Sequence, residues 1–296
     1  MKLTRRRLLA ACGCGAPLIL LGSQSAFAQE CGNLLGVGSR SVFTKAVSAE
    51  QVEQAASLNY QQLKKEAGSK RALAPANHPQ VVRLRAIAER IVPLAMECNP
   101  RARQWQWEVN LVGSNQINAF CMPGGKIAFY SGILENLRLD DDEVAMIMGH
   151  EIAHALQEHA REQMGKSMAT RGAIEVGAAL LGLGGGARLL GDLGGQLLSL
   201  KFGRDDETEA DRVGLVLAAR AGYDPRAGVT LWEKMAAANK GAPPQFLSTH
   251  PSSPSRIKDI QAALPKVAPL YERAAKPPQR FQPAVPRTSE APAKSN

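Results

Sequence analysis

The stretch EVAMIMGHEIAHALQEHAREQM, residues 143–164, decides the fold because it combines a helical pattern with regularly spaced histidines. The acids at 140–142 supply an N-cap and first-turn charges for a helix through this stretch. Residues four apart share one helical face, so His150 and His154 can bind one metal ion, and Glu151 can reach the metal-bound water as general base. The alternative is a chance match, with hydrogen-bonded histidines on an amphipathic helix.

A catalytic zinc site needs a third protein ligand. On a continuous helix, His159 lies roughly 14 Å along the axis from His150 and on the opposite face, so we expect it at the surface or in helix packing. The metzincin pattern has its third histidine six residues after His154, where this chain has Ala160. A distant carboxylate is then the remaining choice.

The acidic stretch KFGRDDETEADRVG, residues 201–214, offers that carboxylate. If residues 204–222 form a helix, Glu207 and Asp211 lie on its small, apolar face. A charge on a buried face needs a partner, which favours Glu207 as metal ligand and Asp211 as acceptor for the N–H of a ligand histidine. A solvated helix start is the alternative reading, and we expect it for Asp205, Asp206 and Glu209.

The segments before the zinc motif predict two helices and a small sheet. Residues 48–66 and 81–94 carry helical periodicity, the first with capping-box spacing. QWQWEVNLVG, residues 104–113, alternates as a half-buried strand does. INAFCM (117–122) and KIAFYSGIL (126–134) flank a Pro-Gly-Gly turn and predict a hairpin. The pattern as a whole predicts a mainly helical α+β domain.

Four motifs resemble a known family in content and order. They are NAFCMPGGKIAFYSGIL (118–134), HEIAH (150–154), ETEAD (207–211) and STHPSSPSRI (248–257). Over residues 75–265 the chain resembles family forty-eight of the metallopeptidases, the gluzincin-class zinc enzymes that include bacterial HtpX and BepA and the CAAX prenyl proteases. The resemblance implies a zincin-type domain, which we place at residues 75–273, with a small sheet beside the active-site cleft.

The resemblance also implies roles for individual residues. It implies one zinc ion per chain held by His150, His154 and Glu207, with Glu151 as catalytic base and Asp211 supporting a ligand histidine. It implies that His250 is a fourth ligand or regulatory plug, and a turn histidine before Pro251 is the alternative. An edge strand that binds substrate peptide is implied at Lys126, Ile127, Ala128, Phe129 and Tyr130.

The two ends of the chain have distinct compositions. Residues 1–28 combine a basic start, an apolar run and Ala-Phe-Ala, which predicts a Sec or twin-arginine signal peptide and a periplasmic location. Lipidation at Cys12 and a membrane anchor are less favoured. Residues 29–74 are expected to form an N-terminal helical segment, and residues 274–296 a Pro-rich disordered tail. The remaining cysteines are odd in number, so any disulfide pairing stays open among Cys31, Cys98 and Cys121.

These features predict an exported zinc endopeptidase that cleaves misfolded or envelope polypeptides. The alternative functions are a non-proteolytic zinc-dependent chaperone of the envelope and a structural protein without metal. The glycine-rich stretch 176–200 is open to three readings: a lid over the cleft, a membrane-surface contact or a buried helical hairpin. The formal net charge is +9, but no basic run carries interleaved aromatic residues, so no nucleic-acid partner is expected.

Overall fold

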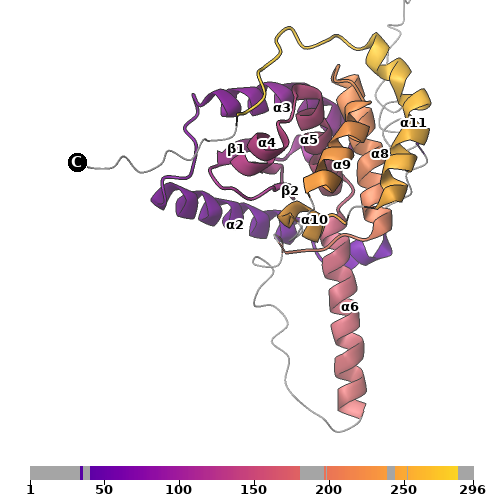
Figure 1. The fold of residues 1–296 in the computed structure, drawn as a ribbon. Helices are drawn as coiled ribbons and strands as arrows, with labels where there is room; N and C mark the ends of the chain where they lie inside the picture. The colour runs from indigo at the N-terminus through magenta and orange to yellow at the C-terminus, as the bar shows by residue number, and fades with distance from the viewer. Residues whose placement is uncertain are drawn as a thin grey trace, which may run out of the picture.

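The computed structural model describes residues 34–35, 41–180, 197, 199–238, 244–251 and 253–285. This part of the chain is mainly helical with one small sheet (Figure 1), which confirms the predicted α+β class. The elements in chain order are η1 (Val42–Ala46), α2 (Ala49–Ser69), α3 (Pro79–Cys98), η2 (Pro100–Arg103), β1 (Glu108–Val112), β2 (Ala119–Met122), β3 (Lys126–Tyr130), α4 (Ser131–Leu137), α5 (Asp141–Leu156), α6 (His159–Leu180), α8 (Arg204–Arg220), α9 (Ala227–Ala238), α10 (Gln245–Thr249) and α11 (Pro254–Arg273).

The sheet has the strand order β1-β3-β2. β2 and β3 form the predicted hairpin, in which Gly124 and Gly125 adopt the positive φ angles (84° and 77°) that favour glycine. β1 pairs in parallel with the other side of β3, Glu108 opposite Lys126. The expectation that residues 126–130 form an edge strand is therefore wrong. β3 is the central strand, because β1 occupies the side that a lone hairpin would leave free.

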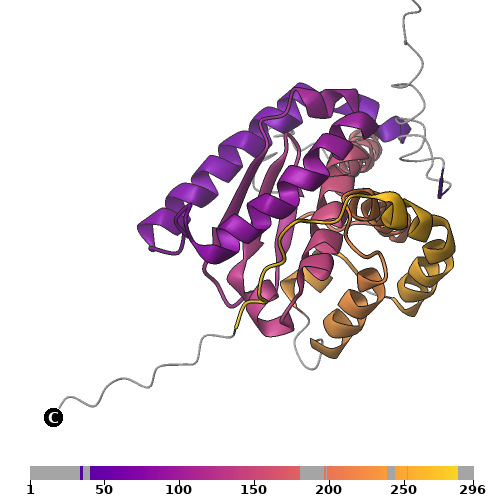
Figure 2. The ribbon, with the colours of Figure 1, turned by 90° about the horizontal axis from the view of Figure 1, so that it is seen from above.

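Helices cover both faces of the sheet (Figure 2). Val109 and Phe129 on one face belong to the main core, together with residues of α3 and α5. The opposite face packs against α2, where Tyr60 is fully buried. Asn110, predicted on a polar strand face, is buried there and donates to the Tyr60 hydroxyl. The N-terminal helical segment thus covers one face of the sheet.

Helix α5 lies at the centre of the helical part. It contacts α3, α8, α9 and strand β2, and its contact with α8 is the most extensive between any two described elements. α6 follows α5 after a sharp break and extends away from the body (Figure 1). The stretch 176–200 lies largely outside the described residues, apart from the last turns of α6 and a few residues before α8.

The segment 274–285 differs from the predicted disordered tail. It runs back from α11 to the start of α5, where the Phe281 backbone N–H donates to Asp141. Arg280 pairs with Asp142, and the Ala284 side chain is buried in the main core. Proline and polar residues do not prevent order here, because neighbouring helices supply partners for the backbone and the charges. Residues 286–296 lie outside the described part.

Two cysteines lie among the described residues. Cys98, at the end of α3, is disulfide-bonded, whereas Cys121 on β2 is a free, buried thiol. Burial raises the pKa of the Cys121 thiol well above its usual value. Cys121 is therefore a packing residue of the sheet.

Candidate metal centre

Helix α5 places both histidines of the zinc motif inside the protein. It begins with a capping box, in which Asp140 accepts from the Glu143 N–H and the Glu143 side chain accepts from the Asp140 N–H. His150 and His154 follow on one face and are 4% and 3% exposed. The helix therefore presents two buried imidazoles to one point, as the spacing predicts.

Helix α8 supplies the predicted carboxylates. Glu207 and Asp211 are both buried, Glu207 at 1% exposure. α8 crosses α5 where Gly149 meets Gly214, and a Cβ added to Gly214 would lie only 2.7 Å from the His150 nitrogen. The two glycines thus permit the close approach that brings carboxylates of α8 to histidines of α5.

His250, the residue that follows α10, lies beside the histidines of α5 and the carboxylates of α8. Its backbone N–H donates to the Phe246 carbonyl, and its ring stacks on the Phe246 ring with centroids 4.5 Å apart. Phe202, just before α8, contacts the rings of His250 and His154. In this structure His250 is therefore a buried member of the cluster rather than a loop residue that faces solvent.

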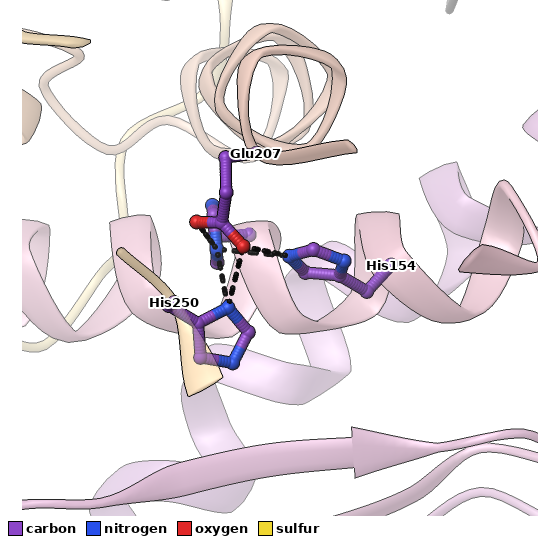
Figure 3. A group of neighbouring side chains, drawn as sticks. His154, Glu207 and His250 are labelled. Atoms are coloured by element: carbon purple, nitrogen blue, oxygen red, sulfur yellow. Dashed lines mark hydrogen bonds and ion pairs between the residues drawn. The ribbon is translucent and has the colours of Figure 1, made fainter. Parts of the chain in front are cut away.

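Four donor atoms converge between these elements (Figure 3). His154 Nε2 lies 3.1 Å from His150 Nε2 and 3.4 Å from Glu207 Oε1. His250 Nδ1 lies 3.0 Å from Glu207 Oε1 and 3.4 Å from His150 Nε2. Zinc with bonds of about 2.0–2.1 Å places tetrahedral ligand atoms roughly 3.4 Å apart. These four separations of 3.0–3.4 Å are close to that value, and all four ligand atoms lie within 4.8 Å of one another, so these residues suit a zinc ion.

The protonation states of His154 and Glu207 also suit a metal. Burial holds the pKa of His154 well below its usual value, so its imidazole is neutral. Burial alone would raise the pKa of Glu207, but His250 and His154 reverse this and hold it well below its usual value. A neutral imidazole and an ionised carboxylate are the forms that bind zinc.

A buried arginine holds the carboxylates of α8. Asp211 accepts from His150 Nδ1 at 3.0 Å, as predicted. Arg256 of α11 donates to both oxygens of Asp211 at 2.7 Å, pairs with Glu207, and lies 3.6 Å from the centre of the Trp232 ring. No role for Arg256 was predicted from the sequence, although this residue lies within the motif STHPSSPSRI.

Glu151 lies beside the four metal-ligating atoms. Its side chain is buried, and among the described residues its Oε1 has no hydrogen-bond partner. His250 Nε2 lies 3.5 Å from this oxygen. Burial raises the pKa of the Glu151 carboxyl above its usual value, although His250 and His150 oppose the shift. An unpartnered buried oxygen at this position is suited to a water molecule or a substrate.

A small cleft of about 50 Å³ opens next to Glu151 and His154. β2 and the adjoining residues 118–123 line one side, and residues such as Phe202 line the other. Strand β3, the strand predicted to bind substrate, does not line the cleft. The strand edge that faces the cleft belongs to β2.

Three residues that were predicted away from the centre lie near it. The helix breaks at Glu158, so His159 is buried and its Nδ1 lies 2.9 Å from His154 Nδ1. Glu209 contacts His159 Nε2, and Asp206 is buried at the start of α8. The prediction for His159 assumed one continuous helix, whereas that for Asp206 assumed a solvated helix start; Glu209 remains partly exposed.

The fold and the centre define a zinc-dependent metallopeptidase domain. The chain belongs to peptidase family M48, whose model matches residues 79–264. Mitochondrial metalloendopeptidase OMA1 of Schizosaccharomyces pombe is 34% identical over 210 residues, 70% of this chain and 59% of that protein. Metalloprotease LoiP of Escherichia coli is 29% identical over 246 residues, 82% of this chain and 91% of that protein. The chain thus spans less than two thirds of the OMA1 relative.

Family membership confirms zinc as the cofactor expected from the sequence. The relatives also test the predicted location of the protein. The OMA1 relatives of fission yeast and budding yeast are mitochondrial by name, which contradicts the predicted periplasmic location. A basic N-terminal start is common to secretory signals and mitochondrial transit peptides, so it does not separate the two. Residues 1–28 lie outside the described part. No described helix is long and apolar enough to cross a membrane.

Proposed function

We propose that this chain is a zinc endopeptidase that hydrolyses peptide bonds in unfolded polypeptide segments, with His150, His154 and Glu207 as metal ligands and Glu151 as base. The observation that carries the proposal is the buried Oε1 of Glu151, which has no hydrogen-bond partner among the described residues and lies beside four converging metal-ligating atoms. The family and the OMA1 and LoiP relatives support the same reaction class.

Each side chain has a separate task in this mechanism. Zinc supplies a Lewis acid that activates water and polarises the scissile carbonyl. Glu151 accepts the proton of the attacking water and later returns it to the leaving amine nitrogen, for which its raised pKa is suited. Asp211 accepts from His150 Nδ1 and keeps the other ring nitrogen directed at the cluster.

Substrate binding falls to strand β2. β3 pairs with β1 and β2 and has no free edge. The outer side of β2 lines the cleft next to Glu151, so an extended peptide that pairs with Ala119–Met122 brings its backbone to the catalytic base. This mode recognises backbone rather than particular side chains, which suits unfolded segments.

In the proposal, His250 is a plug that blocks the position of the attacking water. Its Nδ1 faces Glu207 and its Nε2 faces Glu151, so the ring lies between the base and the other ligands, where the attacking water belongs. Activity then requires His250 to turn away. His250→Ala should raise the turnover rate. A zinc-loaded structure with His250 turned away, together with unchanged activity in that variant, would argue against the plug.

The test of the enzyme is Glu151→Gln in the purified protein. Its zinc content should equal that of the wild type, while cleavage of unfolded casein should fall by about 10²–10⁴-fold, the usual contribution of a general base. Glu272→Gln on the exposed surface of α11 is the matched control. Cleavage retained by Glu151→Gln would refute the assignment. Casein binding without any chelator-sensitive turnover in the wild type would instead favour the non-proteolytic chaperone.

A further inference from the structure

The break between α5 and α6 brings a fourth histidine, His159, to the metal centre. α5 ends at Leu156, and Glu158 adopts a left-handed conformation with φ of 61°. The chain therefore turns before His159, whose side chain is 2% exposed and lies against His154 with ring centroids 4.9 Å apart. His159 is too far from the four donors to join them, because it contacts the opposite side of the His154 ring.

Other contacts fix this position of His159. Arg161 donates to the Val47 carbonyl and pairs with Glu158. Gln163 donates to Asp206 of α8 at 2.6 Å. The first turn of α6 is thus attached both to the N-terminal segment and to the helix that carries Glu207.

The hydrogen-bond roles follow from the position of His154. Its Nε2 faces the donor cluster, so a bound metal takes the lone pair of Nε2 and leaves the ring proton on Nδ1. That Nδ1–H then donates to His159 Nδ1 at 2.9 Å. His159 consequently carries its own proton on Nε2, which faces Glu209 Oε2 at 3.4 Å. Only this assignment satisfies every nitrogen in the chain of contacts.

We propose that His159 is a positioning residue for His154, with Glu209 as the acceptor that fixes the tautomer of His159. This inference rests on the proposed role of His154 as a zinc ligand. His150 has a direct carboxylate partner in Asp211, whereas His154 has an imidazole placed between itself and a carboxylate. Removal of such partners commonly weakens metal binding by about 10–100-fold.

A buried histidine can also act by filling space, so the variants must separate volume from hydrogen bonding. His159→Phe keeps the ring volume and removes the acceptor. His159→Asn places an amide oxygen near the position of Nδ1 and restores an acceptor. Glu209→Ala removes the far carboxylate from a side chain that is 31% exposed, so the fold should tolerate it. Asp205→Asn, on the exposed side of the same helical turn, is the matched control.

The measurement is zinc affinity by competition with a chromophoric chelator, together with the visible spectrum of the cobalt-substituted protein. We expect His159→Phe to bind zinc about 10–100-fold more weakly with an altered cobalt spectrum, and His159→Asn to recover most of the loss. Glu209→Ala should show a smaller loss, and Asp205→Asn none. Equal losses in His159→Phe and His159→Asn would overturn the acceptor role.

Glu209→Ala and His154→Ala keep the proposal testable if His159→Phe does not fold or keeps its zinc. If His159→Phe does not fold, Glu209→Ala decides, and wild-type affinity and spectrum in that variant would overturn the proposal. His154→Ala distinguishes this failure from failure of the proposed function. Zinc lost in His154→Ala but retained in His159→Phe would refute only the positioning role, whereas zinc retained in His154→Ala would refute the metal site itself.

Discussion

The substitution Gly214→Ala tests how the two ligand-bearing helices are held together. A Cβ at this position would lie 2.7 Å from the backbone nitrogen of His150 and 2.9 Å from the carbonyl carbon of Gly149. Both are backbone atoms, so no side-chain rotation can relieve the contact. α8 must move away from α5 for the methyl group to fit.

The required movement can be estimated from the same contacts. An ordinary van der Waals separation begins at 3.4 Å, so the helices must separate by about 0.7 Å. Metal–ligand distances tolerate only about 0.2 Å. Overpacking commonly costs about 1–3 kcal/mol, and the better helix propensity of alanine offsets up to about 1 kcal/mol of that. We therefore expect a modest loss of stability and at least a 10-fold loss of zinc affinity, or about 1.4 kcal/mol.

Two measurements separate these effects. Chelator competition gives the zinc affinity, and urea unfolding of the metal-free protein gives the stability. Gly68→Ala in α2 is the control, because a Cβ there meets nothing within 4 Å and should stabilise the protein by about 0.5–1 kcal/mol without changing zinc binding. Wild-type zinc affinity in a folded Gly214→Ala protein would refute the link between helix separation and ligand geometry.

Three further predictions concern the arginine, the metal and a buried tyrosine. Arg256→Lys should weaken zinc binding by about 10–100-fold, because lysine cannot donate to both oxygens of Asp211 and also reach Glu207. An unchanged zinc affinity in chelator competition would contradict this prediction. Chelation of zinc should lower the melting temperature in calorimetry, since zinc at 100 times its Kd stabilises the native state by about 2.7 kcal/mol; an unchanged temperature would mean that the native state does not bind it. Burial raises the pKa of Tyr223 to about 12. The unfolded chain therefore releases this proton first, and stability falls as pH rises from 10 toward 12; Tyr223→Phe should abolish up to about 2 kcal/mol of that fall in urea unfolding, and parallel pH profiles would refute the effect.

The sequence allowed much of the metal centre to be predicted. Helical spacing placed His150 and His154 together, and the face argument selected Glu207 and Asp211 from a cluster of acids. Both inferences need only local helix geometry, which the structure retains in α5 and α8. The assignment of His250 depended on the family resemblance, because no local rule brings the residue after α10 to the zinc motif.

Other features depend on contacts that local rules do not encode. Glu158 leaves the helical conformation without a glycine or proline to mark the break. His159 was therefore predicted on the helix face opposite His150, whereas it lies against His154. The family resemblance implied that β3 is an edge strand, but β1, which precedes the hairpin in the chain, pairs in parallel with β3. Arg256 carries a charge that normally indicates the surface, and its burial follows from the carboxylates of a different helix.

The attachment of residues 274–285 has a consequence for how the protein matures. The first turn of α5 has its own capping box, and it gains a further contact when the Phe281 backbone N–H reaches Asp141, 140 residues later in the chain. A ribosome makes the zinc motif long before it makes this segment, and contacts so distant in sequence form late in folding. The local cap of α5 therefore forms before the contact that attaches residues 274–285 to its first turn, and that attachment is a late step in the folding of the domain.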